Sequence, residues 1–204
     1  GRNGEAPMPV LAVNAPADAF DTAYEACKIA IEHMTPVMIL SDGYVANGAE
    51  PWQFPKAADL ASIAPKIAKA TNETYQPYLR DENGVRQWAV PGTKGLEHRV
   101  GGLEKEELSG NVSYEPENHE KMVLLRQQKI DNIANFIPAL SCDLEQGDVV
   151  VLGWGSTFGA IKVAVDQLKK EGLAVSQVHL RHLNPLPKNL GEILSRFKTV
   201  LIPE

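Results

Sequence analysis

The chain has 204 residues, 44% of them hydrophobic and 23% charged, an ordinary globular composition with enough apolar surface for one or two domains. Its net charge of −6, with Lys and Arg scattered along the sequence, argues against nucleic acid and anionic membranes as partners, and no apolar run is long enough to cross a bilayer. No signal peptide opens the sequence, and Cys27 and Cys142 form no metal or redox motif, so we expect a cytoplasmic protein.

The first forty residues carry the pattern of one β-α-β unit. Apolar runs at 10–13 and 37–40 flank a stretch, 19–34, whose apolar residues recur at helical spacing. Because both runs are continuously apolar, we expect strands buried on both faces, and therefore a parallel sheet with a right-handed crossover. Two strands do not make a stable sheet, so the rest of this domain is expected before Gly1.

Residues 43–116 are interrupted by prolines and are predicted to be mostly irregular. The Asn-Gly pair at 83–84 favours a hairpin turn between residues 78–80 and 85–88. A glycine-rich segment follows at 91–102. A structureless loop of this length is uncommon in a compact domain and usually serves function or contacts a partner.

A second α/β unit is predicted towards the end of the sequence, after a helix over residues 116–136 that Pro138 ends. Its elements alternate between strand and helix, at 149–152, 157–171, 174–180, 189–196 and 200–202. This order indicates an open parallel sheet.

The sequence GWGSTFG at 153–159 joins the first strand of this unit to its first helix. Such a turn can direct backbone N–H groups towards an anionic ligand or a partner chain. Its spacing is one residue longer than the dinucleotide fingerprint, and the next strand ends in His179, Arg181 and His182, where NAD would need an acidic residue. We therefore predict a Rossmann-like unit without NAD, in which the simplest role of the glycines is close packing.

Polar residues near the strand ends are weaker candidates. His179 and His182 point to opposite faces of an extended strand, so they cannot chelate one metal, and their simplest roles are a core-edge and a loop histidine without carboxylate partners. Arg181 and Lys188 could bind phosphate, but a partner-chain contact or a solvated rim is favoured. Asp42 ends a strand, where it either binds a ligand or caps a turn.

Glu97, His98 and Arg99 form the densest titratable cluster. On a glycine-rich loop they could serve as acid, base and anion clamp, and surface salt bridging is the alternative. The sequence contains no nucleophile elbow, phosphate-binding P-loop, zinc motif or cysteine-pair motif. Spacing alone therefore indicates two α/β pieces joined by a loop-rich connector and identifies no enzyme.

Several further stretches match no generic motif and occur in a characteristic order. They are GRNGE at 1–5, MTPV at 34–37, SDGYVANG at 41–48, EPW at 50–52, PGT at 91–93, GLEHR at 95–99, GGLEK at 101–105, SY at 113–114, NHE at 118–120, GWGST at 153–157 and HLRHLNPLP at 179–187. Through these stretches nearly the whole chain resembles the alpha subunits of 2-oxoacid:acceptor oxidoreductases, most closely the 2-oxoglutarate:ferredoxin oxidoreductase type.

The resemblance implies an α/β chain with three parts. Residues 1–50 would be the C-terminal part of a thiamine-diphosphate pyrimidine-binding domain with a parallel β-α-β arrangement. Residues 51–146 would be a loop-rich connector with a hairpin and one long helix, and residues 147–204 a truncated transketolase C-terminal-like domain with a Rossmann-type parallel sheet. Because the last predicted strand lies at the very end, we expect a fragment of a longer polypeptide.

The resemblance also implies a function. The family oxidatively decarboxylates a 2-oxoacid, here 2-oxoglutarate, in the presence of coenzyme A and reduces ferredoxin. A partner beta subunit would bind most of the thiamine diphosphate and Mg²⁺ and would hold the iron–sulfur cluster. The chain lacks the family's carboxylate for the aminopyrimidine and has two cysteines where a cluster needs four thiolates, so we expect it to be inactive alone. Glu97, His98 and Arg99 are expected on the substrate or coenzyme A side of the subunit interface.

Three other roles stay open. The chain could be a coenzyme A- or nucleotide-binding Rossmann-like module without its own chemistry. It could be a structural interface domain in which the 91–103 loop serves as a dimerisation arm. A transketolase-type enzyme is less favoured, because no diphosphate signature or sugar-phosphate clamp is visible.

Overall fold

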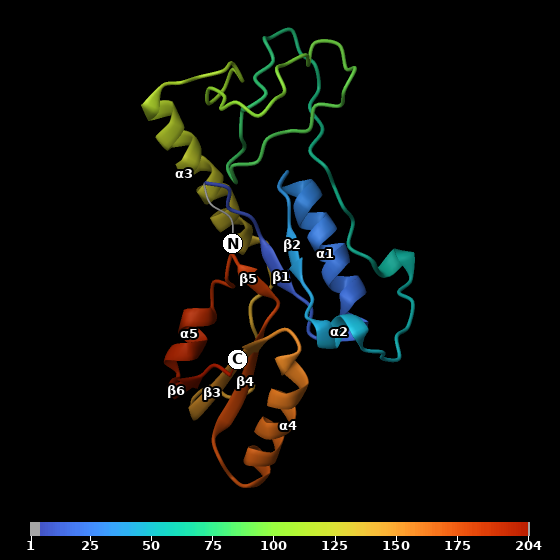
Figure 1. The fold of residues 1–204 in the computed structure, drawn as a ribbon, viewed down its shortest axis with the longest axis vertical. Coiled ribbons are helices and arrows are strands. Elements are labelled where there is room, and N and C mark those ends of the chain that lie inside the picture. Colours follow the sequence, from blue (N-terminus) through green and yellow to red (C-terminus); the bar gives the residue numbers. More distant parts are fainter. Residues whose placement is uncertain (1–4, 204) are drawn as a thin grey trace. The chain divides into compact units, whose positions relative to one another are not determined.

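The computed structural model describes residues 5–203 (Figure 1). Its contacts divide the chain into two compact units. Unit 1 comprises residues 1–8, 28–36 and 61–133, and unit 2 comprises residues 9–27, 37–60 and 134–204. Both units therefore assemble from segments that are distant in the sequence.

The first sheet of unit 2 is built around a central strand, β1 (Val10–Ala12). β2 (Met38–Leu40) pairs with it in parallel, and helix α1 (Ala19–Glu32) connects the two, which confirms the predicted β-α-β unit. On the other edge of β1 lies β5 (His182–Asn184), in antiparallel register. This third strand was not predicted from the sequence.

Burial on both faces was predicted for both parallel strands, and this prediction is wrong for β2. Leu11 of β1 is fully buried, whereas Met38 and Leu40 of β2 are each 47% exposed. β2 forms an edge of the sheet, so its apolar side chains have sheet neighbours on one side only. A short helix, α2 (Gly43–Asn47), follows it.

The second sheet of unit 2 has the strand order β4-β3-β6, and all its pairs are parallel, as predicted. Its elements are β3 (Gly147–Trp154), α4 (Thr157–Lys170), β4 (Val175–Leu180), α5 (Leu190–Ser195) and β6 (Phe197–Leu201). Figure 1 shows α4 and α5 against opposite faces of this sheet.

Alternation along β3 explains why both faces are covered. Val150 belongs to the core cluster that contains Ile193 of α5. Its neighbour Val151 belongs to the cluster formed with Ile161 and Val165 of α4. Successive residues of a strand point to opposite faces, so the continuous apolar run of β3 requires a helix on each side.

Unit 1 contains helix α3 (Pro116–Asn132) and is otherwise mostly irregular. Met122, Ile130 and Ile133 are buried along one side of the helix and the turn after it, as its apolar spacing predicted.

Among the described residues, no helix has both the length and the apolar character that a membrane span requires. Short 3-10 turns lie at Pro16–Asp18, Ala57–Asp59 and Ile133–Asn135.

The predicted hairpin is reduced to a turn with one bridge. Arg80 and Arg86 form an isolated antiparallel bridge, without flanking strands. The carboxylate of Asp81 accepts hydrogen bonds from the amides of Asn83 and Val85, both at 2.9 Å. Because this side chain takes amides that a longer hairpin would use, the turn is stabilised locally and the ladder does not extend.

Candidate functional site

The glycine turn lies between the end of β3 and the first residue of α4. A Cβ atom at Gly153 would lie 2.4 Å from Cδ1 of Ile161 and 2.8 Å from Oγ1 of Thr157. Gly155 has a φ of +58°. The third glycine, Gly159, has no atom within 4 Å of such a position. Close packing therefore requires Gly153, and the backbone conformation favours glycine at position 155.

The anion at this turn is supplied by the chain itself. One carboxylate oxygen of Asp42 accepts a hydrogen bond from the amide of Ser156 at 3.0 Å, and the other accepts one from the amide of Val45 at 3.0 Å. Hydrogen bonds from Ser156 and Val45 lower the pKa of Asp42, so it stays ionised. Besides the close packing predicted for its glycines, a turn of this kind could face an anionic ligand or a partner chain. Its Ser156 amide is instead occupied by Asp42, which both caps α2 and connects the two sheets of unit 2.

A mostly apolar cavity of about 680 Å³ opens beside this connection. It lies at the carboxyl ends of β1, β2 and β3, where open α/β sheets bind ligands. Besides the glycine turn and Asp42, large apolar side chains line it, namely Leu40, Leu152, Trp154, Leu180, Leu183 and Ile202. The cavity has the size and apolar character of a small-molecule site, but among residues 5–203 Asp42 is its one ionisable lining residue.

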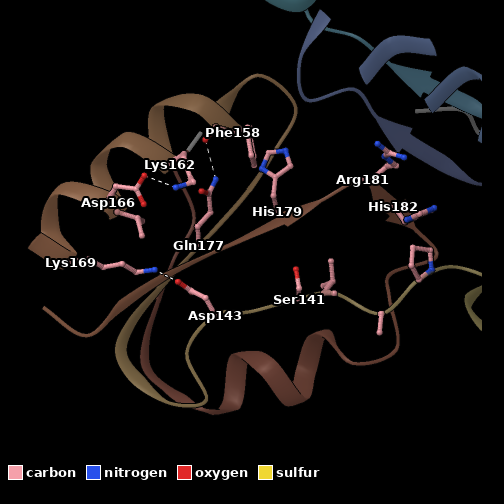
Figure 2. A pocket seen from close by; sticks show the side chains of 14 residues that line it. Ser141, Asp143, Phe158, Lys162, Asp166, Lys169, Gln177, His179, Arg181 and His182 are labelled. Atoms are coloured by element: carbon pink, nitrogen blue, oxygen red, sulfur yellow. Dashed lines mark hydrogen bonds and ion pairs between the residues drawn. The ribbon is translucent and has the colours of Figure 1, made fainter. Parts of the chain in front are cut away.

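A second hollow in unit 2, of about 470 Å³, lies beside α4 and β4 (Figure 2). Lys162 pairs with Asp166 and Lys169 with Asp143, so the lysines at its wall are already neutralised. His179 also lines it, with its ring against Phe158 at 5.0 Å and neither ring nitrogen in a hydrogen bond among the described residues.

Burial lowers the pKa of His179 to about 4, with a smaller opposing effect from the backbone of Gly155. The imidazole is therefore neutral at pH 7. A base with this pKa binds protons too weakly to shuttle them efficiently near neutral pH. The expected role of a core-edge histidine fits these observations.

His182 was expected to be a loop histidine without a carboxylate partner, and Arg181 to contact a partner chain or lie on a solvated rim, but both pair with carboxylates of the chain. Arg181 donates from Nη1 to Oε2 of Glu25 at 3.1 Å and from Nη2 to Asp18. His182 is 4% exposed, and its Nε2 lies 2.8 Å from Oε1 of Glu25. Burial raises the pKa of Glu25, but His182 and Arg181 outweigh it and hold the pKa below its usual value. These side chains connect α1 to β5 and are not available for a phosphate.

The predicted trio lies together on the loop of unit 1 and lines one cavity of about 690 Å³. Oε2 of Glu97 accepts a hydrogen bond from the amide of Gly95 at 2.8 Å. Nδ1 of His98 lies 2.8 Å from the carbonyl oxygen of Leu96, so it carries the proton and leaves Nε2 as the acceptor. Arg99 is exposed. The geometry offers an acceptor and a cation to a ligand in this cavity.

The described residues offer little to the cofactors that the resemblance implies. Among residues 5–203, no three His, Cys, Asp or Glu side chains are placed to hold a metal ion. Cys27 is exposed, and Cys142 donates to Oγ of Ser176 at 3.3 Å. In the described part of the chain, no lysine or arginine lines the apolar cavity. These residues do not fit the diphosphate–Mg²⁺ end of thiamine diphosphate, and they do not fit an iron–sulfur cluster.

Known proteins are similar to this chain along its whole length. Residues 2–116 match the family described as pyruvate flavodoxin/ferredoxin oxidoreductase, thiamine diphosphate-binding, and residues 147–204 match pyruvate:ferredoxin oxidoreductase core domain II. The chain is 51% identical over its full length to the 2-oxoglutarate oxidoreductase subunit KorA of Mycobacterium tuberculosis, of which it covers 31%. Over 98% of its length it is 30% identical to the 2-oxoacid:ferredoxin oxidoreductase subunit alpha of Saccharolobus solfataricus, of which it covers 32%.

A solved structure agrees with these sequence matches. It is described as 2-oxoglutarate:ferredoxin oxidoreductase from Magnetococcus marinus with 2-oxoglutarate, coenzyme A and succinyl-CoA bound. It matches 99% of the chain with a TM-score of 0.87 and 30% identity, and the chain covers 36% of it. The chain thus spans about a third of the length of these relatives, and the predicted fold class is confirmed. Its matched segments and its fold place the chain in the pyruvate flavodoxin/ferredoxin oxidoreductase family.

Proposed function

We propose that this chain is part of the alpha subunit of a 2-oxoacid:ferredoxin oxidoreductase whose substrate is 2-oxoglutarate. In the proposed reaction, 2-oxoglutarate and coenzyme A give succinyl-CoA and carbon dioxide, and two electrons pass to ferredoxin. The observation that carries this proposal is the 51% identity, over all of the chain, to a subunit named for 2-oxoglutarate oxidation. The similarity to a structure with 2-oxoglutarate and coenzyme A bound supports the same substrate.

We propose that other polypeptide segments of the complex, the beta subunit among them, cover part of unit 2. The apolar edge strand β2 supports this, since all three of its residues are exposed. The rings of Phe20 and Trp52 lie 5.3 Å apart and those of Trp52 and Phe54 lie 4.8 Å apart, in a cluster in which Phe54 is 87% exposed. Exposed apolar patches of this kind mark interaction surfaces in soluble proteins.

The cofactor sites are also assigned to other parts of the complex. We propose that a partner subunit supplies the sites for thiamine diphosphate, Mg²⁺ and the iron–sulfur cluster, and that coenzyme A enters as co-substrate. The poor fit of the described residues to these groups supports a partner-held site. We place residues 1–50 in a pyrimidine-binding domain, 51–146 in a connector and 147–204 in a transketolase C-terminal-like domain of a cytoplasmic enzyme.

The reading of the chain as a nucleotide-binding module is less well supported. A phosphate at the glycine turn would have to displace the carboxylate of Asp42 from the amide of Ser156. Two anions would then compete for one donor in a mostly apolar cavity.

The experiment uses the complete subunit that contains this chain, co-purified with its beta subunit. We expect 2-oxoglutarate-dependent reduction of ferredoxin or of a low-potential dye, strictly dependent on coenzyme A, with pyruvate and 2-oxobutyrate as comparison substrates. The 204-residue chain alone should show none of this activity. Activity of the isolated chain would overturn the shared-site assignment, and a complex inactive with every 2-oxoacid would overturn the proposed reaction.

A further inference from the structure

Three basic side chains of unit 1 converge on a cavity of about 520 Å³. Arg80 and Arg86 come from the two sides of the Asp81 turn, and Lys129 comes from α3. We call this the Arg80–Arg86–Lys129 cavity. All three side chains are half-buried, and none of them belongs to the sites described above.

The three cations are held by uncharged groups. Nη1 of Arg80 donates to the carbonyl oxygens of Tyr78 and Glu107, both at 3.0 Å. Nη1 of Arg86 donates to the carbonyl oxygen of Pro77 at 3.3 Å. Nζ of Lys129 donates to the carbonyl oxygen of Met34 at 2.9 Å.

Acidic side chains near this cavity do not pair with the three cations. Within residues 5–203, no carboxylate forms an ion pair with Arg80, Arg86 or Lys129. Glu107 pairs with Lys121. Of the two acidic residues that line the cavity, Glu104 pairs with Arg126 and His119, and Glu5 is exposed. Most buried charges in proteins have a partner of opposite sign, so three half-buried cations without one are unusual.

The surrounding residues fix the cations in place. The guanidinium of Arg86 stacks over the ring of Tyr78 at 4.3 Å, and that of Arg80 lies 5.7 Å from the same ring. Sδ of Met34 accepts a hydrogen bond from Nη2 of Arg86 at 3.3 Å, so Met34 contacts Arg86 and Lys129 together. Met34 has a φ of +46°, a conformation that costs energy for a residue with a Cβ atom.

The electrostatics of the cluster favour an anion between the three cations. Burial, with the charges of Arg86 and Arg80, lowers the pKa of Lys129 to about 8. Burial and Arg86 also lower the pKa of Arg80. The like charges therefore oppose one another, and an anion between them would relieve that repulsion.

We propose that the Arg80–Arg86–Lys129 cavity binds a phosphate group, either as free phosphate or as the phosphoryl group of a small molecule. Two guanidinium groups keep unused N–H donors in a fixed planar arrangement, and the ammonium of Lys129 keeps two more. Cations from three sequence positions around one space suit the several oxygens of a tetrahedral anion better than a planar carboxylate. The inference goes beyond the proposed oxidoreductase reaction and does not depend on it.

The test is calorimetric titration of the purified 204-residue chain with sodium phosphate at constant ionic strength, with sodium succinate as the carboxylate comparison. We expect phosphate to bind at least about tenfold more tightly than succinate. Lys129→Gln keeps a donor for the carbonyl of Met34 and should weaken phosphate binding about tenfold or more. The control Lys94→Gln removes an exposed lysine outside the cavity and should leave the affinity unchanged.

A second measurement does not depend on any variant folding. Trace acetylation of the unmodified chain, followed by mass spectrometry, should show that phosphate protects Lys129 and leaves Lys94 unaffected. Equal labelling of Lys129 with and without phosphate, or phosphate binding no tighter than succinate, overturns the proposal.

The source of the phosphate is resolved by comparing inorganic phosphate, adenosine 3′,5′-bisphosphate and adenosine. Equal affinity for the first two supports a free-anion site, and tighter binding of the bisphosphate supports a phosphoryl group on a larger ligand. Binding of adenosine as tight as that of the bisphosphate overturns a phosphate-directed site.

Discussion

The carboxylate of Asp42 and the backbone amide of Ser156 are 114 positions apart in the sequence and form a hydrogen bond of 3.0 Å. Asp42 lies two residues after the end of β2, and Ser156 immediately precedes the first residue of α4. This bond places the ends of both sheets of unit 2 at one cavity. It gives the glycine turn a structural anion where many α/β proteins bind a ligand anion.

Removal of this carboxylate should loosen the turn. In Asp42→Ala the amides of Ser156 and Val45 lose their acceptor, so we expect roughly tenfold faster hydrogen exchange at Ser156. Asp42→Asn keeps one carbonyl acceptor and should lie between the two. Exchange at Val178, in the core of β4, serves as the internal reference, and unchanged exchange at Ser156 in Asp42→Ala would contradict the assignment.

Substitution by alanine should change stability in opposite directions at two glycines of the turn. Gly153→Ala places a Cβ atom 2.4 Å from Ile161 and 2.8 Å from Thr157, and we expect a destabilisation of about 1–3 kcal/mol through overpacking. Gly159→Ala enters open space within α4 and should stabilise the chain by roughly 0.5–1 kcal/mol through helix propensity. Urea unfolding of both variants checks the pair, and the same sign for both would refute this account of the motif.

His179 makes a pH-dependent contribution to stability. Its pKa is about 4 in the folded chain, against 6.5 for the ordinary group, so the unfolded chain binds more protons between these values. Stability therefore rises with pH across this window, and the full contribution, up to about 3 kcal/mol, is lost as the pH falls towards 4. His179→Phe keeps a ring against Phe158 and should flatten this dependence. Unfolding free energies of the variant and of the unmodified chain at pH 4.5, 5.5 and 7 test it, and the same pH dependence in both would contradict it.

Much of the second sheet could be predicted because its signals are local. The apolar run in the middle of β3 and the helical spacing of Ile161 and Val165 each require burial of a face, and the structure shows both faces covered. The same reasoning predicted burial of β2, where it failed. An apolar pattern indicates that a strand needs packing partners, but it does not indicate which segment supplies them.

The interactions that sequence reasoning missed are the long-range ones. The contact of His182 with Glu25 joins residues 157 positions apart, and β5 pairs with β1 over a similar separation. Neither pairing follows from spacing. The Arg80–Arg86–Lys129 cavity was also missed, because basic residues that are scattered along the sequence gather only when the turn packs near α3. The one available signal was an arginine on each side of the Asn-Gly turn.

Substitution of Lys129 is expected to increase the stability of the chain. Its pKa of about 8 in the folded chain, against 10.5 for the ordinary group, means that the charged form is disfavoured by folding. Between these values the unfolded chain binds more protons, so this group's cost is fully present below pH 8 and is relieved as the pH rises to 10.5. In phosphate-free buffer, Lys129→Met should stabilise the chain at pH 7 by roughly 1–3 kcal/mol, less near pH 10. Urea unfolding at both pH values measures the gain, with Lys94→Met as control. A gain that is absent or independent of pH would contradict the prediction.

The loop trio gives the prediction that bears most directly on catalysis. Nε2 of His98 is an unused acceptor and Arg99 is an exposed cation beside it, and both line the same cavity of unit 1. If this cavity faces coenzyme A or the 2-oxoacid in the assembled enzyme, His98→Ala with Arg99→Ala should raise the apparent KM for one of them by about tenfold, with a smaller change in kcat. Arg99→Lys retains the charge and should recover part of the loss. Steady-state kinetics of the complete complex, with each substrate varied in turn, distinguish the two ligands, and unchanged KM values for both would remove the trio from the site.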